Sequence, residues 1–97
     1  MLYHVEMTVC IPADADGEAI EKLKAEEKAI ALSLQQKGLW RHLWRIAGAY
    51  ANISIFDVDD HDQLHRILSG LPLFPYMEME VTPLALHPSA LDAGESQ

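Results

Sequence analysis

The stretch IEKLKAEEKAIALSL, residues 20–34, decides the fold because it is the one segment periodic enough for a long amphipathic helix. Its apolar residues recur at spacings of three and four and so share one helical face, which should pack on a core. They are Ile20, Leu23, Ile30 and Leu34. Glu27 lies in the middle of this apolar stripe, where a carboxylate needs a physical explanation.

Residues on both sides of this stretch set the bounds of the helix. Asp14 or Asp16 can cap its N-terminus, because a short side-chain oxygen accepts hydrogen bonds from the first free N–H groups. Gly38 is placed to end it. We therefore predict a helix over residues 17–37.

Outward from the helix, the period changes to the alternation of strands. Strands are expected at residues 2–11, 39–47, 50–58 and 77–81. Gly48 permits a hairpin turn between the second and third of them. A shorter helix begins within DVDDHDQL, residues 57–64, and ends before Pro72.

This order of elements predicts an α+β fold of the ferredoxin-like type, βαββαβ, with a four-stranded antiparallel sheet covered on one face by two helices. We expect this domain to span residues 1–86 and residues 87–97 to form a polar C-terminal tail. The uncovered face carries His4, Glu6 and Thr8 on the first strand, which is compatible with a face-to-face dimer. The fold by itself does not decide the function.

Length and composition narrow the class of protein. Ninety-seven residues make one domain, and a single cysteine excludes an internal disulfide framework. The sequence has no N-terminal apolar run with a basic flank, the pattern that predicts export, so we expect a cytoplasmic protein. It also has no run of about 18 apolar residues, so we expect no membrane helix. The net charge of −8 argues against a nucleic-acid partner. A carboxylate substrate would have to be drawn by a local cationic patch.

Glu27 has two interpretations. Burial disfavours a charged carboxylate and raises its pKa, which makes such a group useful for proton transfer near neutral pH. Alternatively, Glu27 lies at the rim of the core and pairs with Lys24 or with a strand arginine. The spacing alone leaves both open.

The segment LWRHLWR, residues 39–45, combines cations with aromatic rings. By the two-residue period, Arg41 and Arg45 share one strand face and Trp40, His42 and Trp44 share the other. A guanidinium suits bidentate binding of a carboxylate. If the tryptophans line a cavity, however, the arginines reach a neighbouring subunit or make interface ion pairs.

The second helix carries a weak metal signal. His61 and His65 are four residues apart, a spacing that can hold zinc. The glutamate of the metalloprotease motif is missing, so we expect no metal site.

Several long stretches together carry a specific resemblance. They are MLYHVEMTVCIP (1–12), LKAEEKAIA (23–31), GLWRHLWRIAGAYANISIFDV (38–58), and LPLFPYMEMEV (71–81) followed by HPS. In these stretches the chain resembles the muconolactone delta-isomerase family of aromatic catabolism, over roughly residues 1–89. The resemblance implies an isomerase of the catechol, or β-ketoadipate, route that moves the ring double bond of muconolactone to give the enol-lactone of 3-oxoadipate. It also implies a cytoplasmic homodecamer that uses neither cofactor nor metal.

The chemistry of this reaction suggests roles for the candidate residues. One carboxylate could remove the vinylogously acidic ring proton and return a proton beside the lactone carbonyl, and Glu27 is placed to do both. Lys24 and side chains from the sheet such as His42 or Asn52 are candidates to stabilise the dienolate oxygen. The residues expected to bind the small lactone carboxylate are Arg41, Arg45, His42, Asn52 and Trp40.

Two alternatives remain at this point. A chloromuconolactone dehalogenase would use the same proton removal but expel chloride. A non-catalytic ferredoxin-like oligomer would bind a small molecule or only assemble, with Glu27 in a structural ion pair.

Overall fold

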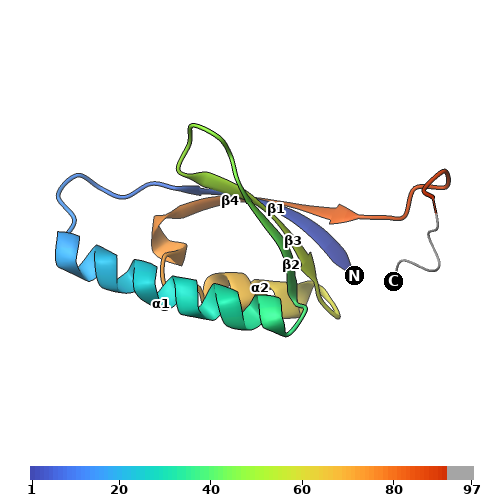
Figure 1. Ribbon diagram of the computed structural model, residues 1–97, viewed down its shortest axis with the longest axis horizontal. Coiled ribbons are helices and arrows are strands. Elements are labelled where there is room, and N and C mark those ends of the chain that lie inside the picture. The colour runs from blue at the N-terminus through green and yellow to red at the C-terminus, as the bar shows by residue number, and fades with distance from the viewer. Residues whose placement is uncertain (92–97) are drawn as a thin grey trace.

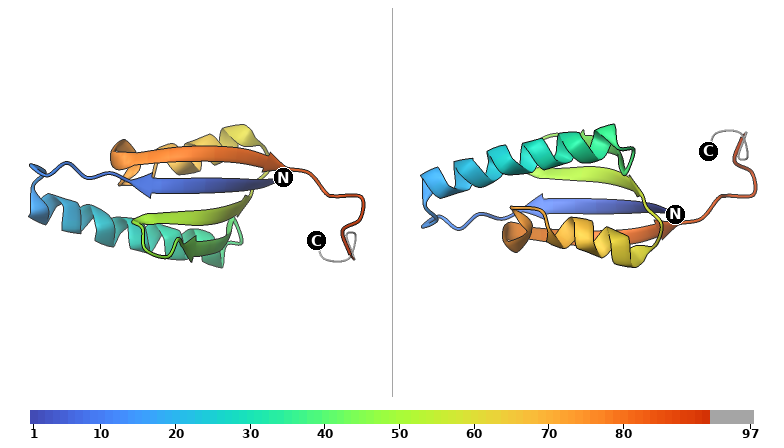
Figure 2. Two further views of the ribbon diagram at one scale, coloured as in Figure 1. Left: turned by 90° about the horizontal axis from the view of Figure 1, so that it is seen from above. Right: turned by 90° about the horizontal axis from the view of Figure 1, so that it is seen from below.

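The computed structural model describes residues 1–91 and confirms the predicted order of elements. The elements are β1 (Leu2–Val9), α1 (Gly17–Gln36), β2 (Trp40–Arg45), β3 (Ala51–Asp57), α2 (His61–Ser69), the 3₁₀ helix η1 (Phe74–Tyr76) and β4 (Met77–Leu84). The strands form one antiparallel sheet in the order β2-β3-β1-β4. Both helices lie against the same face of this sheet, as Figure 1 and the two views in Figure 2 show. The fold is therefore the predicted ferredoxin-like one.

The predicted ends of α1 are correct to within one residue. Asp16 is the N-cap, and its side chain accepts a hydrogen bond from the N–H of Glu18 at 3.0 Å. Gly38 follows the C-cap residue Lys37 and has a φ of +79°, a conformation that favours glycine. These two residues fix where the long helix begins and ends.

The core lies between the sheet and the helices. Alternate residues of β1 are buried, as the two-residue period predicts: Tyr3, Val5 and Met7. Trp40 and Phe56 pack ring against ring beside them, with centroids 4.8 Å apart. From the other helix, the apolar side of α2 completes the core with Leu64 and Leu68.

A bulge in β2 changes which side chains face the helices. The pairing register against β3 shifts between Trp40 and His42, and one extra residue reverses the faces that follow. Trp40 faces the helices, as do Leu43 and Arg45 after the bulge. His42 and Trp44 stack on the open face with their ring planes 6° apart. The prediction that Trp40, His42 and Trp44 share one face is wrong, because a strict alternation assumes an uninterrupted strand.

The first and last strands differ in length from those predicted, and β4 continues to Leu84 where an end at residue 81 was expected. β1 ends at Val9 instead of residue 11, because the next N–H, that of Cys10, bonds to the carbonyl of Tyr76 outside the strand ladder. Beyond β4, residues 85–91 are exposed and extend away from the sheet (Figure 1). The rest of the predicted tail, residues 92–97, lies outside the described residues. Within residues 1–91, no helix is long and apolar enough to span a membrane.

Candidate active site

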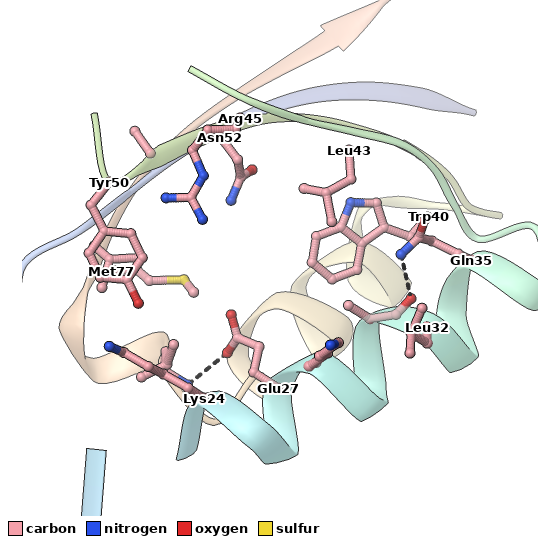
Figure 3. A pocket seen from close by; sticks show the side chains of 15 residues that line it. Lys24, Glu27, Leu32, Gln35, Trp40, Leu43, Arg45, Tyr50, Asn52 and Met77 are labelled. Carbon is pink, nitrogen blue, oxygen red and sulfur yellow. Dashed lines mark hydrogen bonds between the residues drawn. The ribbon is translucent and has the colours of Figure 1, made fainter. Parts of the chain in front are cut away.

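A cavity of about 540 Å³ opens between α1 and the β2–β3 hairpin. Figure 3 shows α1 beneath it and side chains of β2 and β3 above it. Leu73, which precedes η1, and Met77, the first residue of β4, also line it. The cavity is therefore lined from both the N-terminal and the C-terminal parts of the chain. Its polar side chains come from α1 and the β2–β3 hairpin.

One face of α1 supplies the residues beneath the cavity. Each of them is three or four residues from another of the set, so they share one side of the helix: Lys24, Glu27, Lys28, Ala31, Leu32 and Gln35. Gln35 donates from Nε2 to the carbonyl oxygen of Ala31 at 3.2 Å. This cavity-facing row borders the apolar stripe that packs on the core, and Glu27 belongs to both.

Glu27 is half-buried and points into the cavity (Figure 3). Its Oε1 accepts a hydrogen bond from the backbone N–H of Leu73 at 2.9 Å. Burial raises the pKa of Glu27 above its ordinary value, and the Leu73 hydrogen bond opposes this only in part. No ion pair among residues 1–91 includes Glu27, and Lys24 pairs instead with Glu21 at 3.1 Å. The interpretation of Glu27 as the partner of Lys24 or of a strand arginine is therefore wrong.

Three residues form what we call the cationic end of the cavity: Lys24, Arg45 and Tyr50. The Lys24 Nζ lies 5.4 Å from the centroid of the Tyr50 ring, and the Arg45 Cζ lies 5.3 Å from it. The hydrogen bond to Glu21 and the nearby Tyr50 raise the pKa of Lys24, which keeps its ammonium charged. Two permanent positive charges beside one aromatic ring make this end suited to an anionic group.

Asn52 lies above the cavity on β3, across from Glu27 (Figure 3). Its Oδ1 accepts a hydrogen bond from the Ser54 hydroxyl at 2.8 Å. The Asn52 amide nitrogen is thereby left to donate toward the cavity. The opposite end of the cavity is apolar and is lined by Ala31, Leu32, Trp40 and Leu43.

Comparison with known proteins identifies the family of this chain. The muconolactone delta-isomerase family matches residues 1–90. Muconolactone Delta-isomerase 2 of Acinetobacter lwoffii is 59% identical over 91 residues, which cover 94% of this chain and 95% of that protein. This chain belongs to the muconolactone delta-isomerase family.

Two further relatives of the family agree over nearly the whole chain. The muconolactone delta-isomerase of Pseudomonas aeruginosa is 55% identical and covers 98% of this chain and 99% of its own length. A crystal structure of a muconolactone isomerase matches with a TM-score of 0.89 and 56% identity, over 94% of this chain and 95% of that one. The ferredoxin-like fold described above is thus also the fold of a solved family member.

Five of the site residues that the sequence of this chain predicts line the cavity together. They are Lys24, Glu27, Trp40, Arg45 and Asn52. Two others lie elsewhere: Arg41 is at the bulge, with Nη1 3.5 Å from Asp57 Oδ2, and His42 is on the open face. The prediction that Arg41 and Arg45 share a face is wrong for the same reason as that for the tryptophans.

Some residues lining the cavity were missed by sequence reasoning. Lys28 is one helical turn from Lys24, so the spacing that selected Glu27 could have found it. Tyr50 follows the hairpin glycine Gly48 and lies two residues before Asn52, a pattern that strand alternation could have used. The Leu73 N–H had no signal, because it reaches Glu27 across 46 residues of sequence.

The second helix shows no grouping of ligands in the described part of the chain. His61 and His65 are both exposed on α2. Residues 1–91 hold no cluster of three side chains suited to a metal ion.

Proposed function

We propose that this chain catalyses the muconolactone delta-isomerase reaction, with Glu27 as the base that removes and returns the ring proton. Glu27 takes the proton from the ring carbon that bears the acetate arm, and the C–H electrons enter the conjugated system as a dienolate. A proton then bonds to the carbon beside the lactone carbonyl, and the double bond has moved by one position. The reaction moves one proton and one double bond with no net oxidation, so it needs neither an oxidant nor a cofactor.

The observation that carries this proposal is the place of Glu27 in the cavity. Its carboxylate faces the space where a flat ring would fit, and its pKa is raised by burial. A base is most effective when its pKa is near the working pH, and a position beside both ring carbons lets one group act twice. Ala31, one turn along α1, leaves room above the carboxylate.

Two groups are placed to stabilise the negative charge on the dienolate oxygen. Asn52 presents amide N–H donors from above the cavity, and Lys24 brings a charged ammonium from below. Donors that are already in place where charge develops contribute strongly to catalysis. His42, predicted for the same role, is on the open face of the sheet and is no longer part of this proposal.

Arg45 is the residue we propose for the free acetate arm of the substrate. It lies at the cationic end beside Tyr50, whereas Arg41 lies toward Asp57. Trp40 forms part of the apolar wall at the other end of the cavity. The ring would thus lie over Glu27 with its acetate arm toward the hairpin.

The finer features implied by the family resemblance belong to the same proposal. They are assembly into a homodecamer, a cytoplasmic location, and a place in the breakdown of aromatic compounds. Exposed apolar side chains support association: Leu32, Trp44, Val81 and Leu86 are each at least 44% exposed. The mass of the particle in solution, measured by sedimentation, tests the subunit number.

The proposal is tested by giving the purified protein muconolactone and its 5-chloro analogue, with Glu27→Gln and Glu26→Gln variants in parallel. Glu26 is the neighbouring carboxylate, is exposed and does not line the cavity, so it is a matched control. We expect the wild type to isomerise muconolactone, Glu26→Gln to match it, and Glu27→Gln to lose about 10²–10⁴ in kcat.

The other outcomes of this assay identify what would replace the proposal. Chloride release from the analogue without isomerisation of muconolactone would make the chain a dehalogenase. An unchanged rate in Glu27→Gln would remove Glu27 from the mechanism, and no turnover of either compound would leave a binding module.

A further inference from the structure

We propose that Ser54 is a positioning residue, which holds the Asn52 carboxamide with its NH₂ group toward the cavity. The inference rests on the proposed function, because it explains how one of the donors to the dienolate oxygen is kept in its orientation. Ser54 itself does not line the cavity.

The burial of Ser54 is the first observation behind this proposal. Its exposure is 0%, and the other buried residues among 1–91 are hydrophobic ones. Its cross-strand neighbours are Val5 on β1 and Leu43 on β2, neither of which offers a side-chain partner. A hydroxyl in such surroundings needs a hydrogen bond, and the Oδ1 of Asn52 accepts it at 2.8 Å.

This hydrogen bond fixes which end of the carboxamide faces the cavity. Ser54 and Asn52 are two residues apart on β3 and so share the helix-facing side of the sheet. Because the amide oxygen is occupied by the Ser54 proton, the amide nitrogen points to the other side. Figure 3 shows that nitrogen directed toward the space above Glu27.

The neighbouring strand explains why the orientation needs to be held. Arg45 is the residue paired with Asn52 across β2 and β3, and its guanidinium can only donate hydrogen bonds. If the carboxamide turned over, its oxygen would face the cavity and could accept from Arg45, while the buried hydroxyl of Ser54 would lose its acceptor. The turned form would present a lone pair to the negatively charged dienolate oxygen, which is repulsive.

Substituting Ser54→Ala removes the hydroxyl and lets the carboxamide turn. We expect kcat on muconolactone to fall about tenfold with KM within about twofold, because the donor acts mainly on charge that develops during the reaction. Ser54→Thr keeps a hydroxyl and should retain most of kcat. Val5→Ala, a truncation in the same buried layer that leaves the amide contact intact, should keep the wild-type kcat even if it lowers thermal stability.

A double-mutant cycle with Asn52→Ala separates positioning from packing. Loss of one such donor costs about 10²–10³ in kcat, and adding Ser54→Ala to Asn52→Ala should then change kcat by less than about twofold. A further tenfold loss in the double variant, or full activity in Ser54→Ala alone, would overturn the positioning role while the isomerase function stands. Absence of turnover by the wild type would overturn the proposed function and this inference with it.

Discussion

At the scale of single residues, the half-buried carboxylate of Glu27 makes the stability of the fold depend on pH in one direction. Its pKa in the folded chain is raised, chiefly by burial, whereas the unfolded chain has the ordinary value. Between those two values the folded state holds a proton that the unfolded state has released, so the free energy of unfolding falls as pH rises. Above the raised pKa, Glu27 is charged in both states, and the free energy of unfolding no longer falls because of this group.

Glu27→Gln should therefore unfold at a higher temperature than the wild type near neutral pH. The neutral amide avoids the burial of a charge, and its oxygen can still accept from the Leu73 N–H. The difference should shrink toward about pH 4, near the ordinary range of a glutamate, where the wild-type carboxylate is also becoming neutral. Thermal unfolding at the two pH values measures this. A difference of equal size at both would contradict the assignment, and the exposed Glu26→Gln serves as control.

Residue by residue, the sequence indicated those parts of the site that obey a helical or strand period. The position of Glu27 in an apolar stripe marked it as a carboxylate that needs an explanation, with burial and an ion pair both left open. Asn52 became a candidate only through the chemistry that the family resemblance implies. The contact that holds the Glu27 side chain could not be predicted, because Leu73 reaches it only after the chain has folded around α2. Its donor is also a backbone group, which any residue type would provide.

At the scale of elements, the bulge in β2 decides which arginine reaches the cavity. The order and type of the helices and strands followed from periodicity, with predicted ends that differ from the observed ones by up to three residues. The bulge did not, since a tryptophan-rich segment with alternating cations is equally consistent with a straight strand. One extra residue between Trp40 and His42 sends Arg45 toward the cavity and leaves Arg41 near Asp57.

This difference predicts opposite results for the two arginines. Arg45→Ala should raise KM for muconolactone about 10–100-fold, as expected for the loss of a charge-assisted hydrogen bond worth about 1.5–3 kcal/mol. Arg41→Ala should leave KM and kcat near their wild-type values, because its pairing with Asp57 is half-exposed and 3.5 Å long. Steady-state kinetics of both variants test this prediction. A neutral result for Arg45→Ala, or a large KM effect for Arg41→Ala, would refute the proposed acetate site.

At the scale of the whole molecule, the charges are distributed unevenly. The chain has 15 acidic and 7 basic residues, yet the cavity is lined by three of the basic residues and one acidic one, Glu27. The protein as a whole would repel a small anion, so attraction must be local. Lys24 and Arg45 place positive charge at the cationic end, where the substrate carboxylate is proposed to bind, and Lys28 adds a third positive charge to the cavity lining. Glu27 is the negative group left for the chemistry.

The central claim is that the Glu27 carboxylate moves the ring proton, and proton NMR of muconolactone in D₂O observes that step directly. The signal to follow is the proton on the ring carbon that bears the acetate arm. With folded Glu27→Gln at saturating substrate, this signal should disappear about 10²–10⁴ more slowly than with the wild type. Loss of the ring proton at the wild-type rate in that variant would contradict the account.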